Sequence, residues 1–566
     1  MPLTQPARRP GPSRAGALRG AVTPGSVAVG LVLLAGLLLR LRNIDHGLPA
    51  VYHADEALHF TSRAVAMFQD GPNPHYFQNP SGFTYLVHLV LRFGWGHGWP
   101  FGSFHDLLAQ YARDPTSIYV AARVTATVLC LIGVAAVYAA GRRLYGTAAG
   151  VAAAVVLCFA FLPVAYSRLA LTDVAVFAPV AAAVYFAVRV LEDGRRRDVV
   201  LAGAAIGLAI GFKYTAGVLL LPLLAAVVLR GGEKRDMVRT AAWAVGPMVL
   251  VFLITTPFFL LDLHSALYQL KVEHNAAKMP KVGQAAHGTI LFYLDSLTWG
   301  LGWIPAVAAG AGLVLEARRD WRRTLVVALF PLVLFAYIAT ADRYFARWLM
   351  PTYPVLALLA GVAFARLVAL VPARPPVRAV ALAALLAVAV VQPVLADVRT
   401  GTLLGREDTR AQTRDFLERT LPPQARIVVE PAVPEGFFAG RFTEGFGPPP
   451  KTDVNHAGSP TRFIRQLRPA RIDRYRQAGF CVVVVMSLVH DRAVGGPGHR
   501  ADRYYRRLQR ESEVLFHASP YRAGAAPVPF DFDMSTHLYY PRAYERPGPD
   551  VTVYRLDRCR EGVGTP

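Results

Sequence analysis

The sequence predicts an all-α domain that crosses a membrane many times, followed by a soluble α/β domain. Of the 566 residues, 54% are hydrophobic and only 17% are charged, which is far more apolar than a soluble globular protein. Apolar runs of about 20 residues, the length that crosses a bilayer, recur up to residue 396. Beyond it, short apolar stretches alternate with Pro- and Gly-rich segments, a pattern typical of an α/β domain.

The apolar runs predict about eleven transmembrane helices in residues 22–396. The run at 199–229 is too long for one untilted helix and carries Lys213 near its middle, so it is divided there into two short spans. The expected spans are 22–41, 118–141, 148–166, 174–191, 199–212, 216–229, 238–261, 299–315, 324–341, 348–368 and 379–396.

The charge pattern predicts the orientation of these spans. The formal net charge is +22, and arginines cluster in alternate connections, which favours membrane topology over a nucleic-acid partner. Those connections and the basic N-terminus, residues 1–21, are expected in the cytoplasm. An odd number of spans then places residues 397–566 outside the cytoplasm, in a multi-pass protein of the cell (inner) membrane. Arg40 and Arg42 depart from the pattern and are expected to snorkel to the interface.

Two soluble parts are expected on the outer side. The first outer connection, about 43–117, contains an amphipathic stretch at 57–68 and a short apolar run at 83–93, which is interfacial rather than spanning. The C-terminal domain has strand candidates at 426–430, 480–487 and 551–556 and a helix candidate at 500–511. Cys481 and Cys559 lie in this domain and either pair or remain two free thiols.

Adjacent carboxylates form the sharpest candidate site. Asp55 and Glu56, between His53 and His59, follow the first span directly. One of them could take a proton from an acceptor hydroxyl. Two other interpretations remain open: the acids begin a helix, where its positive end favours them, or the four side chains bind a divalent metal ion, although the spacing is not the zinc pattern His-Glu-x-x-His.

Charged residues at the outer ends of later spans are the next candidates. Arg168 and Asp173 follow the third span, where an interfacial salt bridge is an equally good explanation. Lys213 lies between two short apolar helices, and such a charge tends to mark a pathway or a bound counter-ion.

Three arginines and a histidine complete the candidate set. Arg343 and Arg347, four residues apart, are expected to share a helix face at the outer boundary, and Arg123 lies near the outer end of the second span. Guanidinium groups suit a lipid phosphate, although headgroup contacts alone could explain any one of them. His287, in an outer connection, could contact a pyrophosphate, a sugar or a metal, or simply be solvated.

These motifs, in this order and on this side of the membrane, resemble the C-type (GT-C fold) integral-membrane glycosyltransferases. The resemblance is to the protein O-mannosyltransferase and aminoarabinose-transferase relatives, which use polyprenyl-phosphate sugars, and it runs from about residue 22 to 366. The segments that carry it are Asp55-Glu56, residues 73–77 followed by Asn79-Pro80-Ser81, and residues 167–173, 211–215 and 343–354.

The resemblance implies an inverting glycosyl transfer, of a hexose or a pentose, at the outer face. Asp55 would be the general base and Glu56 would support it. Arg123 would bind the donor phosphate, with Lys213, Arg343 and Arg347 as the next candidates. The acceptor would be a hydroxyl of a protein, glycan or lipid. Gln78 to Ser81 stand where aminoarabinose transferases have Lys-Pro-Pro, so a lysine contact to phosphate is not expected there. The relatives' metal site does not carry over.

A secondary transporter or lipid flippase is the alternative function, because it would also have about a dozen spans and charges within them. Transporters commonly consist of two related halves, and no such halving is visible here. The long first outer connection with its paired carboxylates is also unexplained by transport. A membrane scaffold without catalysis is less compatible with the carboxylates and the cations together.

Overall fold

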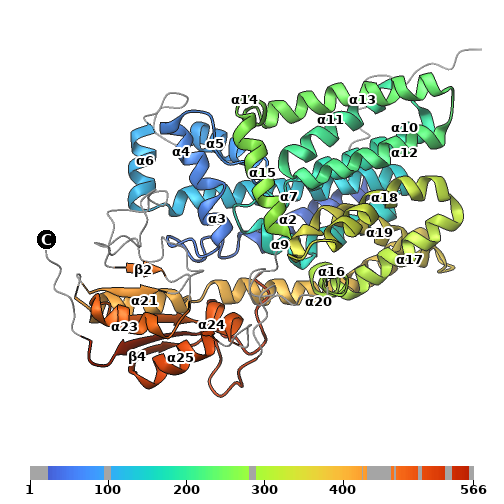
Figure 1. Ribbon diagram of the computed structural model, residues 1–566. Helices are drawn as coiled ribbons and strands as arrows, with labels where there is room; N and C mark the ends of the chain where they lie inside the picture. Colours follow the sequence, from blue (N-terminus) through green and yellow to red (C-terminus); the bar gives the residue numbers. More distant parts are fainter. Residues whose placement is uncertain are drawn as a thin grey trace, which may run out of the picture.

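The computed structural model describes residues 23–94, 104–278, 289–422, 425–429, 461–463, 467–494, 500–528 and 538–559. It consists of a bundle of apolar helices with a small α/β part at one end (Figure 1). The long helix α20 (Pro375–Leu404) runs along the bundle and leads into the α/β part.

Every segment predicted to span the membrane forms a helix over most of its length. Short connections such as Gly146 and Gly194, both with positive φ, separate neighbouring helices. The other bundle helices are α2 (Pro24–Leu41), α7 (Thr116–Tyr145), α8 (Thr147–Phe159), α9 (Phe161–Ser167), α10 (Phe177–Asp193), α11 (Arg196–Phe212), α12 (Leu220–Arg230), α13 (Lys234–Thr255), α17 (Trp303–Arg319), α18 (Trp321–Ala339) and α19 (Tyr353–Ala369).

The number of spans depends on how short helices are counted. In the described part of the chain, seven helices are long and apolar enough to cross a membrane, and α8 with α9, bent by 56° at their junction, makes an eighth. The remaining predicted spans correspond to α10, α11 and α12, which have 17, 17 and 11 residues. The number of eleven spans therefore stays a prediction. The fold agrees with a protein that crosses the membrane several times.

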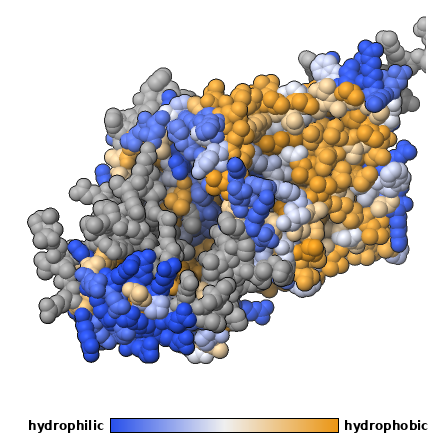
Figure 2. All heavy atoms as spheres, in the orientation of Figure 1, coloured by the Kyte–Doolittle hydropathy of each residue, from blue (hydrophilic) through white to orange (hydrophobic). Residues whose placement is uncertain are grey.

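The surface supports this membrane placement. Figure 2 shows an apolar band over the bundle, with hydrophilic residues gathered at its two ends and over the α/β part. Exposed large apolar side chains lie on α13, α17 and α20, for example Ile254, Val307 and Val380, which are 68%, 67% and 70% exposed. Such side chains are stable against lipid rather than water.

Close helix packing inside the bundle depends on small residues. On α11, a Cβ added to Gly203 or Gly207 would lie 2.2 Å from the carbonyl oxygens of Ala244 and Met248 on α13. Lipid offers little driving force for association between helices, so close backbone approach at such glycines stabilises the pair.

Arg40 corrects an expectation from the sequence. Its side chain is completely buried rather than extended to the interface. The guanidinium donates to the carbonyl oxygens of Gly36 and Cys158, at 3.0 and 2.9 Å. Turned inward from α2, it places both of its terminal nitrogens against acceptors within the protein, whereas Nε has no hydrogen-bond partner among the described residues.

Two long connections between bundle helices, residues 42–115 and 256–302, also contain short helices. The first has α3 (Ala54–Leu58), α4 (Thr61–Asp70), α5 (Gly82–Gly94) and α6 (Phe104–Arg113), so the predicted amphipathic stretch is interrupted at His59 and Phe60. The second has α14 (Phe258–Leu261), α15 (Leu263–Ala277) and α16 (Thr289–Leu297), and a π-helical turn at Thr298–Gly302 connects α16 to α17.

The α/β part contains a mixed five-stranded sheet in the order β2-β1-β3-β5-β4. β1 is parallel to β2 and β3, whereas β5 is antiparallel to β3 and β4. The strands are β1 (Ile427–Val429), β2 (Thr461–Phe463), β3 (Val482–Met486), β4 (Ser512–Ala518) and β5 (Val551–Leu556); the helices are α21 (Thr409–Thr420), α23 (Ala470–Gln477), α24 (Ser487–Ala493) and α25 (Arg500–Arg510). All three strand candidates and the helix candidate are present; β2 and β4 were not predicted.

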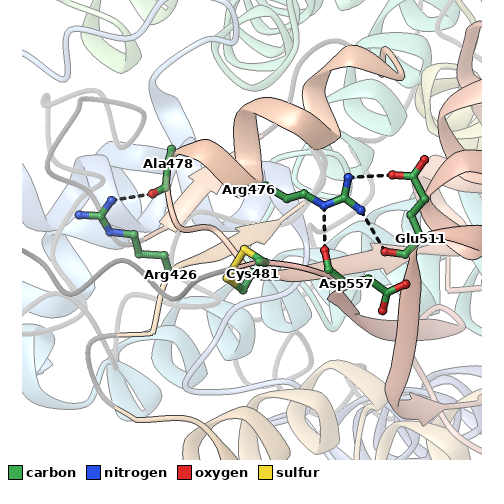
Figure 3. The surroundings of a disulfide bond; sticks show 7 residues. Arg426, Arg476, Ala478, Cys481, Glu511 and Asp557 are labelled. Carbon is green, nitrogen blue, oxygen red and sulfur yellow. Dashed lines mark hydrogen bonds and ion pairs between the residues drawn. A yellow bond between two sulfur atoms is a disulfide. The ribbon is translucent and has the colours of Figure 1, made fainter.

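A disulfide joins Cys481, just before β3, to Cys559, after β5. Nearby, Arg476 donates to a carboxylate oxygen of Glu511 at 2.7 Å and to the backbone oxygen of Asp557 at 2.9 Å (Figure 3). Of the two alternatives for these cysteines, the structure has the pair. Disulfides persist in oxidising compartments, which is consistent with the outer placement expected for this part.

Candidate functional site

Asp55 lies at the centre of a cluster of charged side chains. It is in the first turn of α3, where the positive end of the helix favours an acid. Its carboxylate forms an ion pair with Arg347 and lies 3.6 Å from Nε2 of His59. Asp55 is 30% exposed and Arg347 18%, so both remain accessible to a ligand.

Lys213 and Asp173 form a second ion pair beside the first. Lys213 lies between α11 and the 3₁₀ helix η1 (Tyr214–Leu219), as the sequence predicted, and its ammonium is 3.4 Å from the carbonyl oxygen of Arg347. The turn that carries Asp173 is held by Thr172, whose hydroxyl donates to the carbonyl oxygen of Phe212 at 2.8 Å. Asp55, Arg347, Lys213 and Asp173 thus converge from four distant parts of the chain.

The electrostatics of this cluster keep Asp55 ionised. Burial alone would raise the pKa of its carboxyl, but the charge of Arg347 and the hydrogen bond from His59 outweigh it and hold the pKa well below its usual range. Burial lowers the pKa of His53, although neighbouring Asp55 opposes this, so His53 is neutral at physiological pH. The arrangement contains two carboxylates and two cations, each in an ion pair, which suits proton acceptance by Asp55 beside an anion held by the cations.

Glu56 and Arg123 form a separate, fully buried pair. Nε and Nη2 of Arg123 donate to the two carboxylate oxygens of Glu56 at 2.7 and 2.8 Å, and Glu56 also accepts from the backbone N–H of Ala170 at 2.8 Å. Nη1 of Arg123 donates to the carbonyl oxygens of Ile44 and His46. Four of the five N–H groups of Arg123 are therefore occupied, and the side chain is 1% exposed.

This geometry favours a different role for Arg123 from the one the resemblance implied. A guanidinium without exposure and with its donors committed holds the first outer connection to α7 rather than offering itself to a donor phosphate. Glu56 is likewise out of reach of a substrate. Neighbouring acids in the sequence thus have opposite environments: Asp55 faces the cluster, and Glu56 faces the protein interior.

Arg168 does not join the cluster either. Its side chain is fully buried, and Nη2 donates to the carbonyl oxygen of Leu39 at 2.6 Å. Nε and Nη1 of Arg168 and both carboxylate oxygens of the buried Asp397 have no hydrogen-bond partner in the described part of the chain. Arg168 and Asp173 therefore do not form the interfacial salt bridge considered from the sequence; the acid pairs with Lys213 instead.

Arg343 and Arg347 do not share a helix face, which corrects the sequence-based expectation. Arg343 lies in an irregular segment before the 3₁₀ turn Ala346–Trp348, and its N–H donates to the carbonyl oxygen of Ala277 at 3.0 Å. Helix α19 begins only at Tyr353. Pro351 and Pro354 explain this late start, because neither has the N–H that a helix beginning at Arg343 would need at these positions. His287 lies outside the described residues.

An aromatic wall beside Asp55 was missed by the sequence reasoning. The ring of His59 stacks on Tyr76, with 4.8 Å between centroids, and the guanidinium of Arg63 lies 5.8 Å from the same ring. The segment with Tyr76 docks on α15, where Gln269 accepts from the N–H of Phe77 at 2.7 Å. Tyr76 lies within a motif used for the resemblance, but nothing in its spacing predicted the stacking.

The described residues contain no group of three or more His, Cys, Asp or Glu side chains placed to hold a metal ion. Of the four ligands considered from the sequence, Glu56 is committed to Arg123. Asp55 is paired with Arg347. With both carboxylates engaged by arginines, this donor set does not fit a divalent ion.

Comparisons with known proteins agree with the fold. Residues 117–260 match the family model of dolichyl-phosphate-mannose-protein mannosyltransferases. ArnT from Cupriavidus metallidurans, bound to undecaprenyl phosphate, is similar over 94% of this chain and 98% of that chain, with 16% identity and a TM-score of 0.50. No curated protein matches the chain by sequence.

Archaeal structures extend the similarity. The oligosaccharyltransferase of Archaeoglobus fulgidus in the apo form is similar over 93% of this chain and 88% of that chain, with 11% identity and a TM-score of 0.53. AglB from the same organism, in complex with an inhibitory peptide and a dolichol-phosphate, has 13% identity and a TM-score of 0.51 over 87% and 73% of the two chains. The resemblance predicted from the sequence is confirmed: the chain has the GT-C fold of membrane glycosyltransferases.

Proposed function

We propose that this protein transfers a sugar from a polyprenyl-phosphate donor to an acceptor hydroxyl on the outer face of the membrane, with inversion at the anomeric carbon. The observation that carries the proposal is the ion pair between Asp55 and Arg347, beside Lys213, in a protein with the GT-C fold. It provides a base for the acceptor and cations for the leaving phosphate at the same place.

The reaction needs two things from the protein. The acceptor oxygen forms a bond to the anomeric carbon while the bond from that carbon to the phosphate oxygen breaks, through an oxocarbenium-like transition state. The hydroxyl proton passes to Asp55, and the polyprenyl phosphate leaves with an additional negative charge. Arg347 and Lys213 stabilise that charge, and preorganised cations of this kind contribute most where charge develops.

The ion pair suggests how donor binding activates the base. With Arg347 beside it, Asp55 has a depressed pKa and is therefore a weak proton acceptor. A donor phosphate competes for the same guanidinium, since arginine binds phosphate and carboxylate through the same N–H groups. As Arg347 turns to the phosphate, the pKa of Asp55 rises and the carboxylate becomes a better base. The acceptor is then deprotonated only when the donor is present.

The other candidates take supporting roles in this proposal. Asp173 holds Lys213 in place, and Arg343 lies in the segment leading to Arg347. Glu56 and Arg123 support Asp55 from within the fold. The stacked rings of His59 and Tyr76 offer an apolar face of the kind on which sugars pack. The sugar and the kind of acceptor, whether protein, glycan or lipid, follow from none of these contacts.

The test is transfer of labelled sugar from a panel of polyprenyl-phosphate sugars by membranes containing the full chain. Asp55→Asn is expected to abolish transfer, because the amide cannot accept the proton. Asp45→Asn is the matched control, since Asp45 is an exposed acid in the same connection. Full transfer by Asp55→Asn would refute the role of Asp55. Absence of transfer with every donor, together with movement of lipid between leaflets, would favour a flippase.

A further inference from the structure

The segment before Asp55 has an unusual backbone. Asn43, Gly47 and Val51 have φ values of 53°, 66° and 50°, in the left-handed region. For Val51 this conformation is strained, because a β-branched residue rarely adopts positive φ. Strain of this kind persists only where the surroundings over-determine the conformation, so the contacts of residues 43–53 show which parts of the protein impose it.

Three contacts hold this segment. Nη1 of Arg123, on α7, donates to the carbonyl oxygens of Ile44 and His46. Nδ2 of Asn43 donates to the carbonyl oxygen of Gly401, near the end of α20, at 2.7 Å. The third contact is to Tyr52, the residue after the strained Val51. Two of the three come from the C-terminal half of the chain.

Arg410 makes the contact to Tyr52. Its guanidinium lies 4.0 Å from the centre of the Tyr52 ring, a cation–π geometry. The guanidinium is itself fixed: Nε and Nη2 donate to the two carboxylate oxygens of Asp408 at 2.8 and 2.7 Å. Asp408 also caps α21 by accepting from the N–H of Arg410 at 2.9 Å, and it is 7% exposed. Tyr52 packs against the hydrophobic core between α21 and the sheet.

We propose that Arg410 is a positioning residue for Asp55: fixed by Asp408 at the start of α21, it clamps Tyr52 and so fixes the carboxylate three residues further along. This inference rests on the proposed function and assigns a role in catalysis to the α/β part. Arg410 does not touch the reacting groups. It acts by keeping the backbone that leads into α3 in its strained conformation.

The kinetic test uses the full chain and compares Arg410→Ala, Arg410→Lys and Arg419→Ala. Arg419 is the matched control, because it is exposed on the same helix and its side chain bonds only the backbone oxygen of Asp415 among the contacts described. Arg410→Ala is expected to lower kcat by at least about tenfold, the scale of a small misplacement of a catalytic group, with donor KM within about twofold. Arg410→Lys should recover part of the loss, since a cation remains over the ring.

A second pair of variants tests the contact from its other side. Tyr52→Phe keeps the ring and should retain more activity than Tyr52→Leu. Combining Tyr52→Leu with Arg410→Ala should cost less than the sum of the two changes, because the two side chains share one interaction. A wild-type kcat in Arg410→Ala would overturn the inference. The inference would also be overturned if Arg410→Ala and Arg410→Lys lost kcat to the same extent and thermal stability to the same extent, because a purely structural role predicts that result.

Hydrogen exchange separates this inference from the proposed function. The N–H groups of Ala57 and His59 donate to the carbonyl oxygens of His53 and Asp55 in α3. Arg410→Ala should speed their exchange, and Arg419→Ala should not, whether or not any donor is turned over. Unchanged exchange would refute the clamp. If exchange rises as expected while the wild type transfers no sugar from any donor, the clamp stands and the proposed function fails.

Discussion

Replacing Arg123 with methionine decides between a structural and a phosphate-binding role for this arginine. The change removes two hydrogen bonds to Glu56 and two to the carbonyl oxygens of Ile44 and His46. Glu56, which is completely buried, keeps only the N–H of Ala170. Removing one partner of a buried ion pair typically costs about 3–5 kcal/mol, because the other charge stays buried without compensation.

The assay is the apparent free energy of unfolding of the purified protein in mixed micelles, measured for Arg123→Met, Glu56→Gln and the double variant. Both single variants should be destabilised, and Arg123→Met more so because it also leaves two carbonyl oxygens unsatisfied. The double variant should be less destabilised than the sum of the two by up to about 3 kcal/mol. If Arg123→Met had wild-type stability and a raised KM for the donor, the structural role would be refuted and phosphate binding by Arg123 would be the better explanation.

Three further outcomes are expected. The pKa of folded Asp55 lies below its unfolded value of about 3.9, so its pair with Arg347 stabilises the fold above about pH 4, and this contribution is lost as pH falls through the folded pKa. The unfolding of Asp55→Asn should therefore depend less on pH in that range. Gly207→Leu should lower expression and thermal stability by separating α11 from α13, whereas an exposed glycine, Gly310, should tolerate the same change. Cys481→Ser should free the thiol of Cys559, which should react with a membrane-impermeant maleimide from the outer side, whereas Cys130 and Cys158 are buried. Reaction only after the membrane is opened would place the α/β part in the cytoplasm.

The helical part of the fold was largely predictable from the sequence, because a membrane demands long apolar runs and satisfied backbone groups. The break at Lys213 followed from one charge in an apolar run. The sheet was harder. β1 and β3 are continuous apolar segments, and β5 buries Val551, Val553 and Leu556. β4 has an irregular pattern of exposure with a register shift between Val514 and Phe516, so it lacks the alternation expected for a strand.

The candidate site was predictable in its residue types but not in its pairings. Asp55, Lys213 and Arg347 are charges at the ends of apolar runs, and this signal indicated them. Only the family resemblance distinguished Asp55, as the base, from Glu56; the residue pattern alone does not, because the orientation of α3 decides which acid is exposed. The burial of Arg123 depends on its contact with Glu56, 67 residues away in the sequence. The role proposed for Arg410 depends on the packing of α21 against Tyr52. Pairings between distant segments are set by tertiary structure.

The central claim is that Asp55 is the catalytic base and that Arg347, its ion-pair partner in this structure, binds the phosphate of the donor during the reaction. The most direct measurement compares polyprenyl-phosphate affinity and sugar transfer in the wild type and in Asp55→Asn. The account predicts that Asp55→Asn binds polyprenyl phosphate at least as tightly as the wild type, because Arg347 loses its competing carboxylate, while transfer is lost. Transfer at the wild-type rate by Asp55→Asn, or loss of binding together with transfer, would contradict it.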